Sequence, residues 1–573
     1  MKTHGQNMQH GCFRYYQASK MKNYRLLYFI LLLGLLHCSI VFSRPAVQIN
    51  SDATWVSYTM FGAKLDGKTD DYNAIKKCHE YANINNLAVV QQAGTIFISG
   101  NHKNSIKVRT NTDLHGCTMI IDDSFMNHPV YEFVEDPDNE FVDISSDGIK
   151  SKDQYVIGCH VLPSLKDYKH SFFVVEGSRI LGTRQTPQLL NYKNRESFTI
   201  LSDGVLSDGP LYCDYSSDDI KLKVKSTTTR AITVRLPKLK FKIKKARTSY
   251  NKCFVCSRNN VRLELPRELE YTDYPTDEET SSAMCLVSFR ECCGVKVYGG
   301  DCENKGRLPD EKLQRACYVL GFSLCSDITV ENVKIYRGWG GMNSEFIKTI
   351  TVRDSYLNRF DNHFGISNIF IENCTFVGSN DCINVGYGNG QATIRDIRWI
   401  LARTSSYESY TLLNMRKDIR LSYKGDVYIE NADIVATEGG KSFTLIRMTD
   451  NYKGDNNSYI ECDNIVNSIF LKNLKVDKTI RDVRLLSADF SESSKVQRVN
   501  HLTFDNIRFE NEIKPFYIKN NRNEMPKMLY FDNVTIKDCF FPKMKDWGSI
   551  EDIVINNFTY EGNDSISLKK INR

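Results

Sequence analysis

The sequence has little that would indicate a metalloprotein or a membrane protein. Only one pair among its 18 cysteines, Cys253 and Cys256, has a C-x-x-C spacing, and no second pair stands at zinc-ribbon distance. We therefore expect no metal site and expect most cysteines to be buried core thiols, although disulfide connectivity cannot be read from one sequence. The apolar run Leu26–Leu36 is shorter than the ~20 residues needed to span a bilayer.

This short apolar run has the features of an export signal. Residues 1–20 are polar and unpatterned, and the run follows Met21 and two basic residues. We expect residues 1–20 to be an over-called start and residues 21–43 to be a signal peptide cleaved after Ser43. The mature protein would then be exported to the periplasm, the cell surface or the medium, with no stable membrane span. An uncleaved anchor and a lipid anchor at Cys38 are the alternatives.

Excess charge is also lacking once this segment is removed. The whole chain has 75 basic and 69 acidic residues, a net +6; residues 1–43 hold five basic and no acidic ones, which leaves 70 − 69 = +1. We expect no nucleic-acid partner, and net charge says nothing about an acidic one. The stretch Lys221–Arg247 alternates basic with apolar residues. It predicts either a polyanion-binding wall or, as we favour, solvated strand faces neutralised by the acidic stretch Glu264–Glu279.

A short pattern repeats along most of the chain. It reads apolar, any, apolar, any, Asn or Asp, any, any, apolar, and it starts at Ile350 and again at Ile369. Its apolar positions alternate with period two, which excludes helical repeats. The Asn/Asp position recurs every 19 to 42 residues and falls on Asn332, Asp354, Asn373, Asp396, Asn431, Asn473, Asn506, Asn533 and Asn557.

One coil of a parallel β-helix accounts for each repeat, with loops inserted in the longer intervals. We predict an all-β fold, a single-stranded right-handed parallel β-helix over residues 55–573. Each recurring Asn or Asp should adopt the left-handed conformation of a sharp turn and bond to the neighbouring turn. The first coils are expected to include the strands Thr95–Gly100, Ile106–Ile121 and Ser171–Gly182.

The segment FGAKLDGKTDDYNAIKKCHEYAN, from Phe61, predicts a helix near residues 70–85. Asp70 or Asp71 would cap it, and its apolar stripe would cover the open end of the first coil. This segment closely resembles the opening motif of pectate-lyase-superfamily proteins, right-handed β-helices that include polysaccharide lyases, family 28 glycoside hydrolases (polygalacturonases) and phage tailspikes. The motif is specific for the fold and indicates almost nothing about the reaction that the protein catalyses, if any.

The central coils carry the candidate site. Asp361 stands seven residues after its template position and Asp381 eight after the next, so we expect both on the outer surface of adjacent coils, about 4.8 Å apart. There they would add little to stability, and their mutual repulsion would raise one pKa and leave the other low. Trp339 and Arg403 hold the same offset in neighbouring coils and would stack on a sugar ring and hold a substrate carboxylate. Arrays of outward polar residues without function are the alternative.

The short stretch around Asp361 also contains Arg359 and His363, a substrate ligand and a proton-transfer group. Ser379-Asn380-Asp381-Cys382 resembles the Asp-Asp-Cys segment of polygalacturonases, with Asn380 in place of the first Asp. Phe360-Asp361-Asn362 matches only the Asp of their Asn-Thr-Asp motif. No Gly-His-Gly follows, and Arg416-Lys417 is the nearest basic pair to their Arg-Ile-Lys.

The resemblance implies a secreted protein that hydrolyses an acidic, uronate-containing polysaccharide without a cofactor. Its catalytic residues would be Asp361, Asp381 and His363, and its substrate-binding residues would be Arg359, Arg403, Trp339 and Asn380. Two alternatives stay open: a polysaccharide lyase, for which Ca²⁺ would be expected, and a non-catalytic glycan-binding or adhesive β-helix. The polysaccharide and the oligomeric state are not predicted.

Overall fold

The chain divides into two units, residues 1–53 and residues 54–573. The computed structural model describes residues 54–122, 128–145, 152–185, 189–242, 251–272, 284–302, 318–335, 340–401, 409–416, 423–437, 442–448, 464–490, 496–520, 528–541, 543–544 and 553–561. The expected signal peptide and Cys38 lie outside these ranges. Among the helices within them, none is long and apolar enough to cross a membrane.

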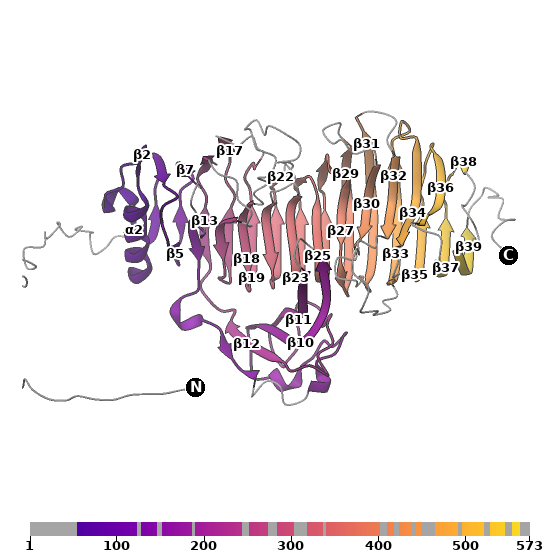
Figure 1. The fold of residues 1–573 in the computed structure, drawn as a ribbon, viewed down its shortest axis with the longest axis horizontal. Helices are drawn as coiled ribbons and strands as arrows, with labels where there is room; N and C mark the ends of the chain where they lie inside the picture. The colour runs from indigo at the N-terminus through magenta and orange to yellow at the C-terminus, as the bar shows by residue number, and fades with distance from the viewer. Residues whose placement is uncertain are drawn as a thin grey trace, which may run out of the picture. The chain divides into compact units, whose positions relative to one another are not determined.

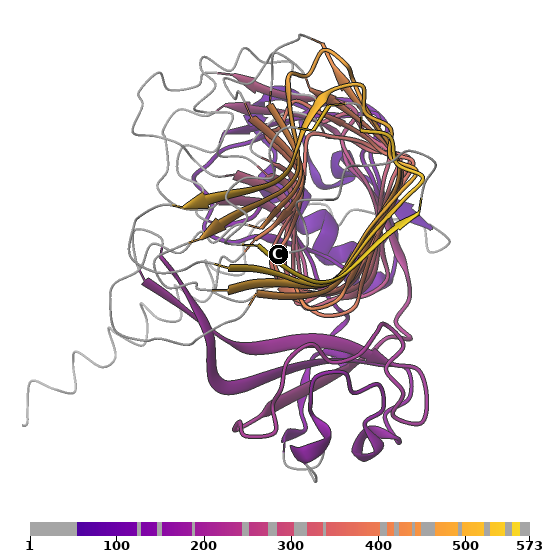
Figure 2. The same cartoon turned by 90° about the vertical axis from the view of Figure 1, so that its right-hand side faces the viewer.

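A parallel β-helix makes up most of the second unit. Its strands stack coil on coil in chain order, and the end-on view shows them wound around a common interior (Figures 1 and 2). The predicted fold class, a single right-handed parallel β-helix, is confirmed. Within the described residues the largest sheet has 30 strands. They are β1 (Trp55–Val56), β3 (Ala88–Val90), β5 (Ile106–Val108), β6 (Thr112–Asp113), β8 (Tyr131–Phe133), β13 (Ile232–Arg235), β15 (Asn251–Cys256), β16 (Val261–Glu264), β18 (Met284–Arg290), β19 (Cys293–Tyr298), β20 (Tyr318–Ser323), β21 (Ser326–Glu331), β22 (Lys334–Ile335), β23 (Gly340–Arg353), β24 (Tyr356–Leu357), β25 (Phe360–Glu372), β26 (Thr375–Val377), β27 (Asp381–Val385), β28 (Tyr387–Gly388), β29 (Gln391–Leu401), β30 (Ser409–Met415), β31 (Asp426–Ala436), β32 (Ser442–Met448), β33 (Asn464–Val476), β34 (Asp482–Phe490), β35 (Val496–Asp505), β36 (Glu512–Asn520), β37 (Met528–Lys537), β38 (Lys543–Met544) and β39 (Ile553–Glu561).

Apolar rows along the interior hold the coils together. In each coil the inward residues of one strand lie directly over those of the next, because the strands pair in parallel register. One such row has no member more than 1% exposed: Ile350, Ile369, Ala392, Val427, Ile469, Leu502 and Val534. Full burial of an aliphatic side chain is worth about 1.5–3 kcal/mol, so a row of this length is a major stabilising term.

The predicted Asn turns form a ladder. Seven of the nine template positions, from Asn332 to Asn506, have φ between 49° and 57°. Their side chains bond from coil to coil, as in Asn473 Nδ2 to Asn431 Oδ1 at 2.9 Å. The prediction is wrong for Asn533 and Asn557, which lie inside β37 and β39 and pair with each other. Asp538 makes the turn there, because the pattern also fits five residues further along the chain.

The predicted capping helix is α2 (Tyr72–Asn85), which follows the 3₁₀ turn η1 (Tyr58–Phe61). Its expected stripe, Ile75, Cys78, His79 and Ala82, is buried. Asp71 holds the N-cap position, but its carboxylate accepts hydrogen bonds from the backbone of Lys64 and Leu65 instead of from the helix. These hydrogen bonds attach the segment around Lys64 and Leu65 to the start of α2.

A second sheet completes the first coils. Its parallel strands are β2 (Asp66–Asp70), β4 (Thr95–Ile98), β7 (Thr118–Asp122), β14 (Lys238–Lys242) and β17 (Leu269–Thr272). The basic strand β14 lies here beside β17 of the acidic stretch, and Lys240 pairs with Glu270 at 2.7 Å. In the large sheet, Arg235 of β13 pairs with Glu264 of β16 at 2.7 Å. The favoured interpretation, strand faces neutralised by the acidic stretch, therefore holds for Arg235, Lys238 and Lys240. Lys223 and Lys225 pair instead with Glu291 and Glu135, outside the acidic stretch.

The prediction that Ser171–Gly182 belongs to the first coils is wrong. It begins β10 (Ser171–Gln185), which pairs antiparallel with β11 (Leu189–Ile200) and β12 (Lys221–Ser226). With β9 (Val142–Asp143) these strands form a separate four-stranded sheet, the inserted sheet, beside the coils (Figure 1). The segment alternates like a coil strand, but alternation does not distinguish parallel from antiparallel pairing. Three 3₁₀ turns accompany the insertion: η2 (Pro137–Asn139), η3 (Lys152–Gln154) and η4 (Pro163–Leu165).

Buried polar contacts attach the inserted sheet to the middle coils. Lys348 of β23 lies 2.7 Å from Glu196 of β11, and neither side chain is exposed to solvent. Asp208 accepts a hydrogen bond from Ser326 of β21. Outward aromatic residues of the coils, Phe346 and Phe364 among them, join the apolar core of the insertion. This contact covers a face that would otherwise be exposed, so all of residues 360–367 are buried.

All 14 cysteines within the described ranges are free thiols, and all but Cys159 are buried. The expectation of buried core thiols is confirmed for them. Burial raises the pKa of several, for example Cys78 to about 12, so these thiols stay protonated at neutral pH.

Candidate functional site

The structure brings five of the seven predicted site residues into one region. Arg359, Asp361 and His363 lie at the start of β25, and Asn380 and Asp381 lie at the start of β27, its neighbour in the stack. Trp339 and Arg403 lie outside the described residues, so their predicted roles stay predictions.

The predicted stacking of the two carboxylates is wrong. Asp361 pairs with Asn384, and Asp381 pairs with Thr411 of the following coil. Asn384 stands 11 residues after its turn at Asn373, whereas Asp361 stands seven after its own turn. The coil of Asn384 therefore has four more residues between its turn and its next strand than the coil of Asp361 has. Counting residues from the turn cannot reveal such an insertion. Asp381 precedes the row of Asp361 by three residues, but the two charges still influence each other.

Asp361 is a buried anion, not the exposed carboxylate that was expected. Its side chain is fully buried and accepts hydrogen bonds from Arg359, from Arg416 at 2.5 Å and from the Tyr318 hydroxyl at 2.8 Å. Burial by itself raises the pKa of Asp361, but the charges of Arg359 and Arg416 outweigh it and hold the pKa well below its usual range. Asp361 is therefore ionised at neutral pH.

Arg416 reaches Asp361 across an intervening coil. Arg416 follows β30, which lies two coils beyond β25. In the intervening coil, Gly386 holds the position next to Arg416. A Cβ at Gly386 would lie 1.8 Å from the His363 carbonyl oxygen, so no side chain fits there. The glycine thus leaves the path of the arginine open.

His363 lies beside the same anion. Its Nε2 is 3.4 Å from the Tyr318 hydroxyl and 3.8 Å from Asp361 Oδ2, and the ring is 7% exposed. The inserted sheet contacts the next residue, since the rings of Tyr192 and Phe364 are 4.4 Å apart. The insertion therefore helps to fix this end of β25.

Asp381 differs from Asp361 in exposure and in the direction of its pKa shift. It is partly exposed, and Asn414 Nδ2 donates to it over 3.5 Å. Burial is the main cause that raises the pKa of Asp381; Arg359, Arg447 and Arg416 oppose the rise, and the charge of Asp361 adds to it. One pKa is thus raised and the other lowered, as expected, but desolvation rather than mutual repulsion is the larger cause.

A polar row along the coils contains the residues that sequence reasoning missed. From Asn384 onwards it runs through the middle of an apolar-polar-apolar triplet, as in Ile383-Asn384-Val385 and Leu413-Asn414-Met415. This triplet was the available signal. The row consists of Asn343, Asp361, Asn384, Asn414, Arg447, Ser487 and Tyr517.

We call Arg359, Asp361, His363, Asp381, Asn414, Arg416 and Arg447 the Asp381 site. It contains three arginines and two carboxylates. Asp361 is paired with both Arg359 and Arg416, so among the described residues of the site the positive charges outnumber the negative ones. Arg416 and Arg447 are partly exposed. Guanidinium groups bind carboxylates in a bidentate manner. Asn414 is buried, and its Nδ2 donates to Asp381 and to Asn384, so it orients Asp381 from within the site.

Comparison with protein-family models gave no match, and neither did comparison with curated protein sequences. Among solved structures, the chain is similar to the tailspike protein gp49 of Pseudomonas phage LKA1, with 12% identity, a TM-score of 0.40, and coverage of 84% of this chain and 81% of that one. It is similar to PfbA, a surface adhesin of Streptococcus pneumoniae, with 12% identity, a TM-score of 0.37, and coverage of 89% and 92%. It is also similar to the family 28 exopolygalacturonase of Yersinia enterocolitica, with 10% identity, a TM-score of 0.33, and coverage of 90% and 79%. Likenesses of this size concern the fold alone, which the strand pairing already establishes.

Proposed function

We propose that the protein binds an acidic polysaccharide at the Asp381 site, on the outer face of β25, β27, β30 and β32. The excess of guanidinium groups on a partly exposed polar face carries this proposal. A uronate carboxylate would bind Arg447 and Arg416, and the partly exposed Asn380 would bind a sugar hydroxyl. Export by the predicted signal, residues 21–43, would bring the protein to extracellular polysaccharide.

Calorimetric titration with a uronate oligosaccharide and with a neutral one of equal length tests the binding. We expect the uronate to bind more tightly, and added salt to weaken it. Arg447→Gln should weaken uronate binding about 10- to 100-fold, since a hydrogen bond to a charged group contributes about 1.5–3 kcal/mol. Arg398→Gln, which removes an exposed arginine of β29, is the matched control. Equal affinity for both sugars, or wild-type affinity in Arg447→Gln, would exclude this site.

Hydrolysis of the bound polymer is the second candidate function, and the raised pKa of the partly exposed Asp381 favours it. Asp381 would give its proton to the glycosidic oxygen, as a general acid does. Asp361 is buried between two guanidinium groups, so we assign it the positioning of Arg359 and Arg416 instead of the role of acid or base. His363 stands beside it as the acceptor for a proton from water.

Assays of released product test this second function separately from binding. Asp381→Asn should lower turnover by about 10² or more while uronate affinity is kept, because a general acid contributes about 10² to 10⁴ in rate. Asp433→Asn, at an exposed aspartate of β31, should be fully active. Products with a new reducing end indicate hydrolysis, whereas an unsaturated sugar that absorbs ultraviolet light indicates a lyase. Binding without any product would leave only the glycan-binding function.

A further inference from the structure

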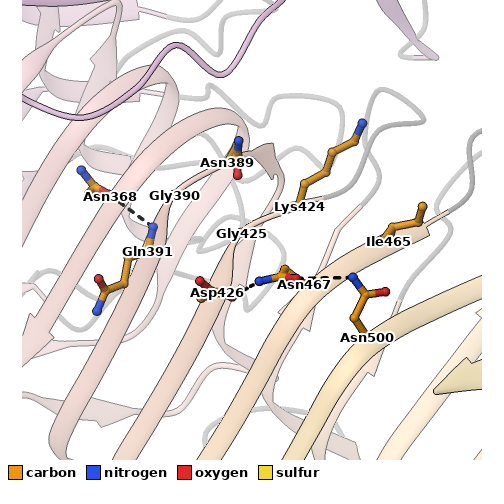
Figure 3. Close-up of a pocket in the computed structure, with 10 residues that line it drawn as sticks. All are labelled: Asn368, Asn389, Gly390, Gln391, Lys424, Gly425, Asp426, Ile465, Asn467 and Asn500. Atoms are coloured by element: carbon orange, nitrogen blue, oxygen red, sulfur yellow. Dashed lines mark hydrogen bonds between the residues drawn. The ribbon is translucent and has the colours of Figure 1, made fainter. Parts of the chain in front are cut away.

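A cleft of about 490 Å³ lies at a corner of the coils, away from the Asp381 site (Figure 3). It begins at Asn368, which is seven residues further along β25 than Asp361. Its polar lining comes from β25, from the turns and first residues of β29 and β31, and from residues within β33 and β35. We call it the amide groove, and the lining residues used below are Asn368, Gln391, Lys424, Asp426, Asn467 and Asn500.

Hydrogen bonds hold the amide side chains of the groove in order. Asn467 Nδ2 donates to Asp426 Oδ1 at 2.6 Å, and Asn500 Nδ2 donates to Asn467 Oδ1 at 3.4 Å. Figure 3 shows these three side chains as one connected chain along the groove. Among the described residues, no protein donor or hydroxyl is bonded to Asp426 Oδ2 or Asn500 Oδ1. The groove therefore presents fixed acceptors together with the remaining amide donors.

The amides repeat with the period of the coils. Asn467 and Asn500 hold equivalent positions in adjacent coils, because their neighbours Ser468 and His501 are paired. Neighbouring parallel strands are about 4.8 Å apart. A hexose unit has a comparable length, so two successive sugars of an extended chain would meet the same kind of side chain on these two coils, next to the glycines Gly390 and Gly425 that hold the equivalent positions in the preceding coils.

Bare backbone forms part of the floor of the groove. A Cβ at Gly425 would lie 2.1 Å from the carbonyl oxygen of Gly390, so neither position can carry a side chain into the groove from that direction without moving the backbone. Without side chains at these two positions, the groove stays open along the coils. This shape suits an extended polymer better than a compact small molecule.

The lining is electrically balanced. Lys424 and Asp426 supply one charge of each sign, and the remaining polar lining residues are amides. Amides both donate and accept hydrogen bonds, as sugar hydroxyls do, and they offer no excess charge for a uronate. The groove and the Asp381 site therefore differ in the ligand that they suit.

We propose that the amide groove is a second glycan-binding site, which binds an extended run of uncharged sugar units. It is independent of the function proposed for the Asp381 site. A polysaccharide in which neutral and acidic stretches alternate could occupy both sites on one molecule, and the two contacts together would bind it more tightly than either alone.

Saturation-transfer NMR and calorimetry of the full chain with neutral hexasaccharides (cello-, manno-, xylo- and malto-hexaose) and with hexagalacturonate test this proposal. We expect at least one neutral hexasaccharide to bind, and the double variant Asn467→Ala/Asn500→Ala to weaken it about tenfold or more, as the loss of two hydrogen-bonding side chains predicts. Asn467→Trp, which fills the groove, should abolish binding. Asn556→Ala removes the same kind of amide beyond the groove and should bind like the wild type.

The outcomes separate this site from the first. Arg447→Gln should leave neutral binding unchanged, and Asn467→Trp should leave the binding of hexagalacturonate unchanged. The inference fails if no neutral hexasaccharide binds the wild type, if the double variant binds as the wild type does, or if Arg447→Gln weakens neutral binding equally.

Discussion

Replacing Asp361 with asparagine should destabilise the protein strongly. The substitution keeps the size of the side chain but removes the charge that compensates Arg359 and Arg416, and Arg359 is only 3% exposed. Removing one partner of a buried ion pair typically costs about 3–5 kcal/mol, because the other charge stays buried without compensation. We expect a loss of this size in the free energy of unfolding, far above the effect of an ordinary surface substitution.

Urea unfolding at pH 7 measures this loss, followed by tryptophan fluorescence, to which the buried Trp399 contributes. Asp381→Asn is the matched control. Asp381 is partly exposed, and burial disfavours its charged form and raises its pKa, so a neutral amide in its place should move the midpoint little. The midpoints can be compared only if the m-values of the variants are equal, because a long repeat protein need not unfold in one step. Equal midpoints for the two variants would refute the reasoning.

The pH dependence gives a second check on Asp361. Its pKa in the folded protein lies below the value of about 4 that it has when unfolded. Its contribution to stability is therefore fully present above about pH 4 and is lost as the pH falls towards the folded pKa. The gap between wild type and Asp361→Asn should be constant from about pH 5 to 8 and should shrink below about pH 4.

Two further predictions concern the attachment of the inserted sheet. Burial raises the pKa of Asp208 to about 6, above its unfolded value of about 4, so the stability that it contributes is present below pH 4 and is lost as the pH rises through 6. Asp208→Asn should remove this part of the pH dependence in denaturant midpoints measured from pH 4 to 7; an unchanged slope would contradict it. Lys348→Ala leaves Glu196 buried without its cation and should cost about 3–5 kcal/mol. Hydrogen exchange should then speed up in β10, β11 and β12 before the coils from β31 onwards, and uniform acceleration would show that the pair does not hold the insertion.

The repeat could be predicted because its physical cause is local. A left-handed turn favours Asn or Asp whatever surrounds it, so Asn373 and Asn473 could be placed from the sequence alone. The capping helix could be predicted for the same reason, from its N-cap and its apolar stripe. Asn533 failed because two overlapping matches to the pattern are equally good locally, and only pairing with β39 decides between them.

The candidate site was predicted less well, because its geometry depends on contacts between distant residues. Corner lengths set which residues share a row, and the longer corner before Asn384 moved Asp381 out of the row of Asp361. Burial was misjudged as well. Period two predicts that every second side chain faces solvent, but Arg416 and the inserted sheet cover β25 from outside. Neither covering element is adjacent to β25 in sequence.

The inserted sheet also sets an order of events in folding. Successive coils need only their immediate neighbours, so they can add one at a time as the chain emerges. Glu196 and Asp208, however, bond to Lys348 and Ser326, more than 100 residues later in the chain. Until those coils have formed, Glu196 and Asp208 have no partners from the coils. The apolar residues of the insertion that later pack against the coils are also exposed. Docking of the inserted sheet closes a long loop, so we expect it among the late and slow steps of folding. During these steps its exposed apolar residues would be a binding site for chaperones.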